Sequence, residues 1–143
     1  MFRQHPLLTT VTVVYLGAVV WITLGPQPVA QEGVFFRVLG WLQAYGWLTW
    51  VTYTGVEFTA NVLMFLPIGL FFLLLLGRRR WWLAAIVGAT LSATIEFVQL
   101  FLPERVSDPR DLAANSAGAV LGVIIGLIAT WPAAIRRREA VRL

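Results

Sequence analysis

The sequence has no cysteine and no lysine, and it is poor in charge of either sign. Without cysteine, disulfide bonds and thiolate metal sites are excluded. Only 13% of the 143 residues are charged, whereas soluble domains carry about 25%. Because 59% of the residues are hydrophobic and the mean hydropathy is +0.77, the chain has too few polar side chains to cover a surface that faces water. It is expected to form one integral membrane domain over residues 1–143, with a core at about residues 11–126.

Four apolar runs are long enough to cross a bilayer, whose hydrocarbon core needs about 20 helical residues. They cover residues 7–24, 57–76, 81–102 and 112–131. The first could be a signal peptide, but its long apolar run and poor cleavage site favour a retained helix. Residues 34–51 are rich in Trp and Tyr, which concentrate at membrane interfaces. We therefore predict an all-α polytopic bundle of four transmembrane helices with an outer interfacial amphipathic helix, a fifth span being the alternative.

The basic residues predict the orientation of these helices. All 11 are arginines, and the net charge is +4. Eight of the 11 fall on one side of the predicted membrane, namely Arg3, Arg78, Arg79, Arg80, Arg136, Arg137, Arg138 and Arg142. The positive-inside rule makes that side cytoplasmic, so both termini are expected on the cytoplasmic side of the membrane. Clusters beside apolar runs indicate contact with membrane lipids rather than nucleic acid.

Glu96 interrupts the third apolar run, although a carboxylate at the centre of a membrane helix costs about 2.5–3.5 kcal/mol. The predicted topology brings other polar residues to the same outer depth, and their i,i+3 or i,i+4 spacing places each set on one helix face. We predict an outward-opening pocket in which Glu96 faces Asn61, Asn115 and Arg105. The full set of candidate ligand-binding residues is Glu57, Asn61, Glu96, Gln99, Arg105, Asp108, Asp111 and Asn115.

Several of these residues have a simpler structural explanation. Thr54 to Glu57 has the form of a capping box, so Glu57 could only cap a helix. The order Asp108, Pro109 and Asp111 is that of a helix start, with Asp108 as N-cap. Arg105 could be a solvated loop charge. Asn61 and Asn115 could make ordinary interhelical hydrogen bonds.

A metal or cofactor is only weakly indicated. Glu96, Asp108 and Asp111 could hold Mg²⁺ through oxygen ligands, but their spacing is not distinctive. No cofactor is therefore predicted, and no motif for a nucleophile paired with a base is visible. The small residues Gly118, Gly122 and Gly126 recur every four positions, which favours close helix packing. That packing is most simply within the chain, and a homo-oligomer is the alternative.

Three blocks of the sequence resemble the VanZ family: "EFTANVLMFLPIGLFF", "IEFVQLFLPERVSDPRDLAANSAGAVLG" and, more loosely, "WITLGPQP". The matching positions are Asn61, Pro67, Gly69, Glu96, Gln99, Arg105, Asp108, Asp111, Asn115, Gly118 and Gly122. The name-giving member of that family is associated with resistance to teicoplanin. The resemblance implies a small cell-envelope membrane protein that could lower susceptibility to glycopeptide antibiotics. It does not imply a particular reaction.

Three functions are compatible with these features. The first is a membrane protein whose outer pocket binds or modulates an envelope component, such as a lipid-linked wall precursor or its peptide. There Arg105 would pair with a phosphate or carboxylate. The second is an intramembrane enzyme in which Glu96 is the acid or base, assisted by Asp108 and Asp111. The third is a small transporter in which Glu96 carries protons or cations. The absence of charge in the inner halves of the helices favours the first.

Overall fold

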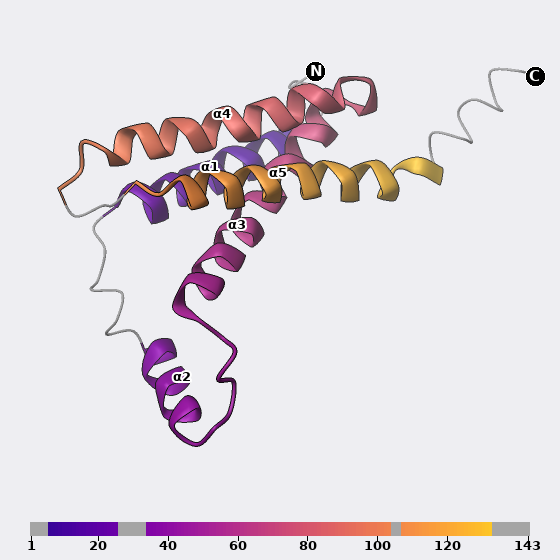
Figure 1. Ribbon diagram of the computed structural model, residues 1–143. Coiled ribbons are helices and arrows are strands. Elements are labelled where there is room, and N and C mark those ends of the chain that lie inside the picture. Colours follow the sequence, from indigo (N-terminus) through magenta and orange to yellow (C-terminus); the bar gives the residue numbers. More distant parts are fainter. Residues whose placement is uncertain (1–5, 26–33, 104–106, 133–143) are drawn as a thin grey trace, which may run out of the picture.

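The computed structural model describes residues 6–25, 34–103 and 107–132 (Figure 1). Within those ranges the chain is helical and has no strand, which confirms the all-α prediction. The elements, in chain order, are α1 (Pro6–Leu24), α2 (Val34–Ala44), α3 (Tyr53–Leu76), the 3₁₀ turn η3 (Arg78–Arg80), α4 (Trp81–Gln99) and α5 (Pro109–Ala129). Four stretches of the described residues are long and apolar enough to cross a membrane, so the protein is a multi-pass membrane protein.

The segment between the first and second spans forms a shorter helix than predicted. α2 ends at Ala44 because Gly46 and Leu48 both have positive φ, at 81° and 52°, which α-helical residues do not adopt. Its 11 residues rise about 16 Å at 1.5 Å each, about half of a hydrocarbon core of about 30 Å. The alternative of a fifth span is therefore wrong, and α2 projects from one end of the four-helix bundle (Figure 1).

The closest packing in the bundle is between α3 and α5, which run parallel. Gly118 and Gly122 lie against the backbone of α3 at Val62 and at Leu66, so closely that an added Cβ would collide with main-chain atoms. Gly69 of α3 lies equally close to the backbone of Ala119. Small residues of this kind let membrane helices approach until their backbones touch. The glycine stripe is thus used within the chain, and a homo-oligomer would need a different face.

α1 packs onto the other helices through a few specific contacts. Val19 is 1% exposed and belongs to a cluster with Phe65, Ile68 and Ile95. The hydroxyl of Tyr15 donates a hydrogen bond of 2.9 Å to the carbonyl of Met64. These are the contacts of a bundle helix, as expected for a retained first span.

Two helix ends differ from the prediction. α3 begins at Tyr53, with Thr52 as N-cap accepting from the amide of Gly55, so Glu57 lies beyond the first turn and does not cap the helix. α4 ends at Gln99, and Glu96 therefore lies in its last turn rather than six residues from the end. A carboxylate costs less near the interface than at the bilayer centre. The capping prediction for α5 is confirmed, since Asp108 accepts from the amide of Arg110 and Pro109 follows it.

Candidate functional site

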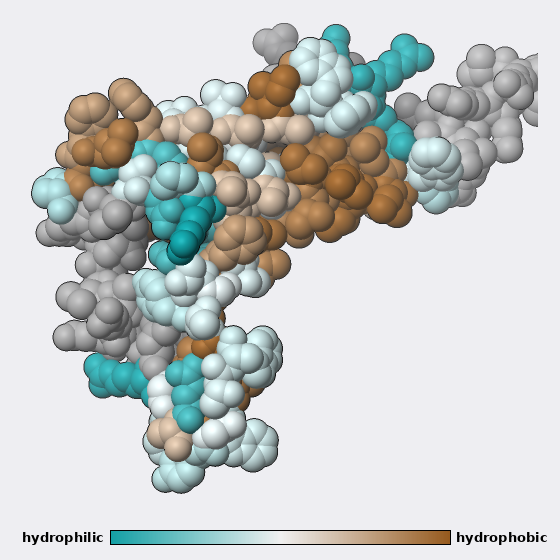
Figure 2. Space-filling view, in the orientation of Figure 1, coloured by the Kyte–Doolittle hydropathy of each residue, from teal (hydrophilic) through white to brown (hydrophobic). Residues whose placement is uncertain are grey.

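The polar side chains of three helices meet at the end of the bundle where α4 ends and α5 begins. α4 and α5 run side by side in opposite directions (Figure 1). Gly88 of α4 lies against Ala119 of α5. Moving outward by one helical turn on each helix brings Ser92 level with Asn115, and a second turn brings Glu96 level with Asp111. Hydrophilic surface gathers near the first turns of α5 (Figure 2). We call Glu57, Glu96, Asp108 and Asp111 the acidic cluster.

Glu96 is turned into the protein, with 8% of its surface exposed. Its Oε2 accepts a hydrogen bond of 2.7 Å from the hydroxyl of Ser107 and one of 3.1 Å from the backbone amide of Asp108. Both donors precede the first turn of α5, whose N-terminal end carries partial positive charge and favours nearby carboxylates. The loop before α5 therefore satisfies an acid that would otherwise lie unfavourably at the negative end of α4.

Asp111 connects the acidic cluster to α3. Its Oδ1 accepts a hydrogen bond of 2.8 Å from the amide nitrogen of Asn61. The carboxylates of Glu57, Glu96 and Asp108 all lie near enough for their charge to act on Asp111. The described hydrogen bonds of Glu96 and Asp111 use one oxygen of each carboxylate. Among the described residues, none donates a hydrogen bond to Oε1 of Glu96 or to Oδ2 of Asp111, so both atoms can accept from another group.

A second polar layer lies one turn deeper and is not satisfied by the described part of the chain. Ser92 is 0% exposed and Asn115 is 2% exposed, and neither Ser92 Oγ nor Asn115 Oδ1 has a described hydrogen-bond partner. Gln99 donates to the carbonyl of Thr23 at 3.0 Å, but its Oε1 also lacks a described partner. A buried polar atom without a partner costs about 1–3 kcal/mol. These atoms are available to a ligand or to water.

The predicted site residues are therefore brought together with different partners from those expected. Glu96 was predicted to face Asn61 and Asn115, but its described hydrogen bonds are with Ser107 and the backbone of Asp108. Arg105 lies outside the described residues. Sequence reasoning missed Ser107 and Ser92 as members of the site. Ser92 lies four residues before Glu96, which is a spacing that shares one helix face and could have identified it.

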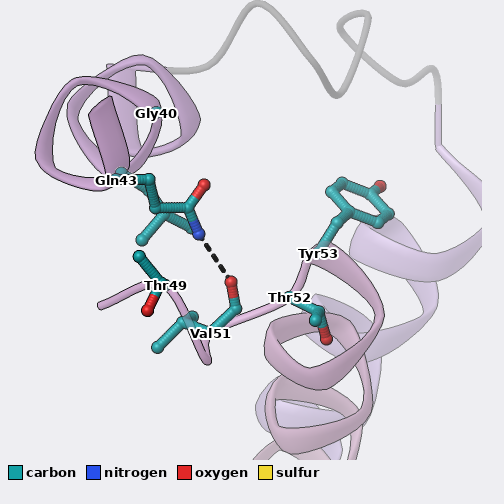
Figure 3. Close-up of a pocket in the computed structure, with 7 residues that line it drawn as sticks. Gly40, Gln43, Thr49, Val51, Thr52 and Tyr53 are labelled. Atoms are coloured by element: carbon teal, nitrogen blue, oxygen red, sulfur yellow. Dashed lines mark hydrogen bonds between the residues drawn. The ribbon is translucent and has the colours of Figure 1, made fainter. Parts of the chain in front are cut away.

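A pocket beside this site lies between α2 and the start of α3 (Figure 3). It is not formed by the residues at which α3, α4 and α5 meet. It has a volume of about 430 Å³ and is lined by Leu39, Gly40, Gln43, Thr49, Val51, Thr52 and Tyr53. The amide of Gln43 donates a 2.7 Å hydrogen bond to the carbonyl of Val51 and so ties α2 to the segment that enters α3. Tyr53 also interacts electrostatically with Glu57 and Asp111. The pocket therefore borders the acidic cluster.

A metal ion has no obvious set of protein ligands here. Among residues 6–25, 34–103 and 107–132, no three His, Cys, Asp or Glu side chains are arranged to hold one. The carboxylates instead take hydrogen bonds from a hydroxyl, an amide side chain and backbone N–H groups. What this arrangement offers chemically is a set of buried and half-buried hydrogen-bond acceptors.

The fold and this site define a class of protein: a small multi-pass helical membrane protein with acids and amides gathered at one end of the bundle. Comparison with known families is consistent with that class. The model of the VanZ/LLP1 family matches residues 12–130, and the chain belongs to this family. Neither a curated protein nor a solved structure matches the chain.

Proposed function

We propose that the protein binds a component of the cell envelope at the acidic cluster, on the outer face of a bacterial plasma membrane. The arginine distribution supports this orientation, because the cluster lies at the opposite end of the bundle from Arg78, Arg79 and Arg80. Both termini are then cytoplasmic. The ligand reaches the cluster from the aqueous side or along the surface where α2 lies.

The observation that carries the proposal is the geometry of Glu96. A membrane helix keeps a buried carboxylate, two donors hold one of its oxygens, and the other oxygen has no hydrogen-bond donor among the described residues. Buried ionisable residues in membrane proteins usually serve a function. The deeper acceptors on Ser92 and Asn115 extend the same chemistry inward. A group rich in N–H or O–H donors fits such a site better than an anion does.

A lipid-linked cell wall precursor has the required chemistry, because its peptide carries amide and ammonium donors and its lipid lies in the same membrane. Binding of that precursor or its peptide is our preferred interpretation. Lowered susceptibility to teicoplanin and other glycopeptides would follow if binding changes how the precursor is presented. Arg105 is proposed to pair with a phosphate or carboxylate of the same ligand.

An enzyme is the second candidate, and one observation favours it. The hydroxyl of Ser107 donates to the carboxylate of Glu96 at 2.7 Å, which is the distance of a nucleophile from its general base. No motif in the sequence indicates that Ser107 and Glu96 form a pair. A transporter is less well supported, because Leu73, Ala84 and Val123 form a buried apolar cluster in the inner half of the bundle. A buried apolar cluster of this kind is unfavourable for a polar path through a single chain.

The binding proposal is tested with purified protein in lipid nanodiscs and a photoactivatable lipid-linked wall precursor. Saturable labelling is expected. Glu96→Gln should weaken it about tenfold, because a hydrogen bond to a charged group is worth about 1.5 kcal/mol or more. Thr59→Val is the matched control, since Thr59 is exposed and, within the described part of the chain, its hydroxyl donates to the Gly55 carbonyl of its own helix.

Each outcome of this experiment has a distinct meaning. Equal labelling of the wild-type protein and a normally folded Glu96→Gln variant would refute the proposed site. A probe recovered with a changed mass, in a reaction that Ser107→Ala abolishes, would favour the enzyme instead. Retention of unmodified probe supports binding without turnover.

A further inference from the structure

A second site lies at the opposite end of the bundle, where η3 meets the last turn of α5. A groove of about 490 Å³ is lined there by Arg78, Ile124, Leu127, Ile128, Trp131 and Pro132. Arg78 is the only charged residue among them, and the other walls are apolar. Figure 2 shows hydrophobic surface over the C-terminal half of α5, with hydrophilic surface beside it at the η3 end.

The guanidinium of Arg78 is held in one orientation by the end of α5. Its Nη1 donates to the carbonyl of Leu127 and, at 2.6 Å, to the hydroxyl of Thr130. The guanidinium carbon also lies 5.5 Å from the centre of the Trp131 ring. A cation is favourable at the negative end of a helix. The described hydrogen bonds use Nη1, and the edge formed by Nε and Nη2 is the fork that binds a phosphate through two parallel hydrogen bonds.

We propose that this groove binds one anionic phospholipid. The phosphate lies on the Nε and Nη2 edge of Arg78, and an acyl chain lies along Ile124 and Ile128, which are 45% and 68% exposed. Trp131 marks the depth of the headgroup region, where Trp side chains concentrate. The groove thus combines an apolar surface, along which an acyl chain can lie, with a cation held in place at the membrane interface.

Charge selects an anionic lipid over a zwitterionic one. Arg79 and Arg80 follow Arg78 directly, and three further arginines, Arg136, Arg137 and Arg138, come shortly after α5 in the sequence. Each basic residue near an anionic membrane surface adds to the attraction between the protein and that surface. The same charges would repel the corresponding end of a second copy of this chain. The inference does not depend on the acidic cluster or on the function proposed for it.

The test measures the thermal stability of the full-length protein in detergent with added lipid. Phosphatidylglycerol and phosphatidylcholine with identical acyl chains are compared, and inorganic phosphate is a third arm. Phosphatidylglycerol should raise the Tm by about 3 °C more than phosphatidylcholine does, because ligands that bind only the folded state stabilise it. Arg78→Gln should reduce this preference by at least half, because the phosphate loses its direct hydrogen-bond donor while the neighbouring arginines remain. Arg37→Gln removes an exposed arginine of α2 and should keep it.

A second variant covers the case in which Arg78→Gln does not fold. Ile128→Trp fills the groove without removing the hydrogen bonds of Arg78, and it should reduce the preference for phosphatidylglycerol by at least half. Equal stabilisation of the wild-type protein by the two lipids would overturn the proposal. So would a preference for phosphatidylglycerol in either variant that is as large as in the wild-type protein. An equal effect of inorganic phosphate would also overturn it, because the acyl chain would then contribute nothing.

Discussion

At the residue scale, the hydrogen bond between Asn61 and Asp111 is the direct polar link from α3 to α5 at the acidic end of the bundle. The amide nitrogen and the carboxylate oxygen are 2.8 Å apart, and the bond is partly buried. Interhelical hydrogen bonds in membrane proteins contribute about 0.6–2 kcal/mol, which is less than the absence of water would suggest. The pair therefore orients the carboxylate of Asp111 more than it stabilises the fold.

Replacing Asn61 tests this estimate. Asn61→Ala should lower the free energy of unfolding by about 0.6–2 kcal/mol, because Asp111 loses its side-chain donor while the packing of α3 hardly changes. Unfolding in mixed detergent micelles, followed by circular dichroism, measures the effect. Thr59→Val on the same helix should change stability by less than about 0.5 kcal/mol. If Thr59→Val lowered the free energy of unfolding as much as Asn61→Ala does, the hydrogen bond from Asn61 to Asp111 would make no specific contribution.

Residue spacing was enough to predict which way Glu96 points, but not what it contacts. Gly88, Ser92 and Glu96 repeat every four residues, and this stripe faces α5 in the structure. The partners of Glu96 are Ser107 and the amide of Asp108, which belong to a connection between helices. The path of a connection depends on where both of its helices end. α4 ends at Gln99, and helix periodicity does not determine that end.

At the element scale, the seam between α3 and α5 determines the architecture. Gly69, Gly118 and Gly122 remove the side chains that would keep the two backbones apart. Lipid supplies little hydrophobic driving force between helices, so close van der Waals packing has to hold them together. The same seam brings Asn61 to Asp111, and the position of the acidic cluster thus depends on these glycines.

A methyl group added to the seam should therefore be costly. Gly122→Ala would place a Cβ against the backbone at Leu66 and Leu70, and we expect a loss of about 1–3 kcal/mol or more. Gly17→Ala is the matched control, because Gly17 lies in α1 and an added Cβ there has no described atom within 4 Å. The control should be neutral or slightly stabilising. Equal stability of the two variants in a detergent unfolding assay would contradict the packing described.

The element that sequence patterns predicted least well is α2. The apolar and aromatic content of residues 34–51 predicts one interfacial helix, with a fifth span as the alternative, but within that segment only Val34–Ala44 is helical. A positive φ at Gly46 is easily adopted by glycine, whereas Leu48 at 52° needs its neighbours to hold it there. Gln43 does this by donating to the carbonyls of Leu48 and Val51. The hydropathy of the sequence does not predict a side-chain contact of this kind.

At the scale of the whole molecule, the two ends of the bundle carry opposite charge. Glu57, Glu96, Asp108 and Asp111 lie at one end, and Arg78, Arg79 and Arg80 lie at the other. Hydropathy, helix count and arginine distribution were sufficient to predict this layout, because each depends on composition along the chain and not on contacts. The pocket beside α2 could not be predicted in the same way, since it forms between segments whose relative position only tertiary structure determines.

The orientation can be measured with single cysteines, because the natural chain has none to interfere. Pro103→Cys lies in the exposed turn after α4 and should react with an impermeant thiol reagent in intact cells. Arg79→Cys lies in η3 and should react only after the cells are opened. The reverse pattern would invert the topology and place the acidic cluster in the cytoplasm.

Cross-linking of α3 to α5 at the outer surface tests most directly whether the acidic cluster joins these two helices and faces outward. Cysteines are placed at Asn61 and Asp111, and intact cells are treated with a short, impermeant bifunctional thiol reagent. An intramolecular cross-link between the two positions is expected, because the side chains of Asn61 and Asp111 are 2.8 Å apart. The matched pair Leu63→Cys and Asp111→Cys should give none, because the side chain of Leu63 is 60% exposed, whereas that of Asn61 bonds to Asp111. Failure of the first pair to cross-link would contradict the contact between α3 and α5, and cross-linking only after the membrane is permeabilised would contradict an outward-facing acidic cluster.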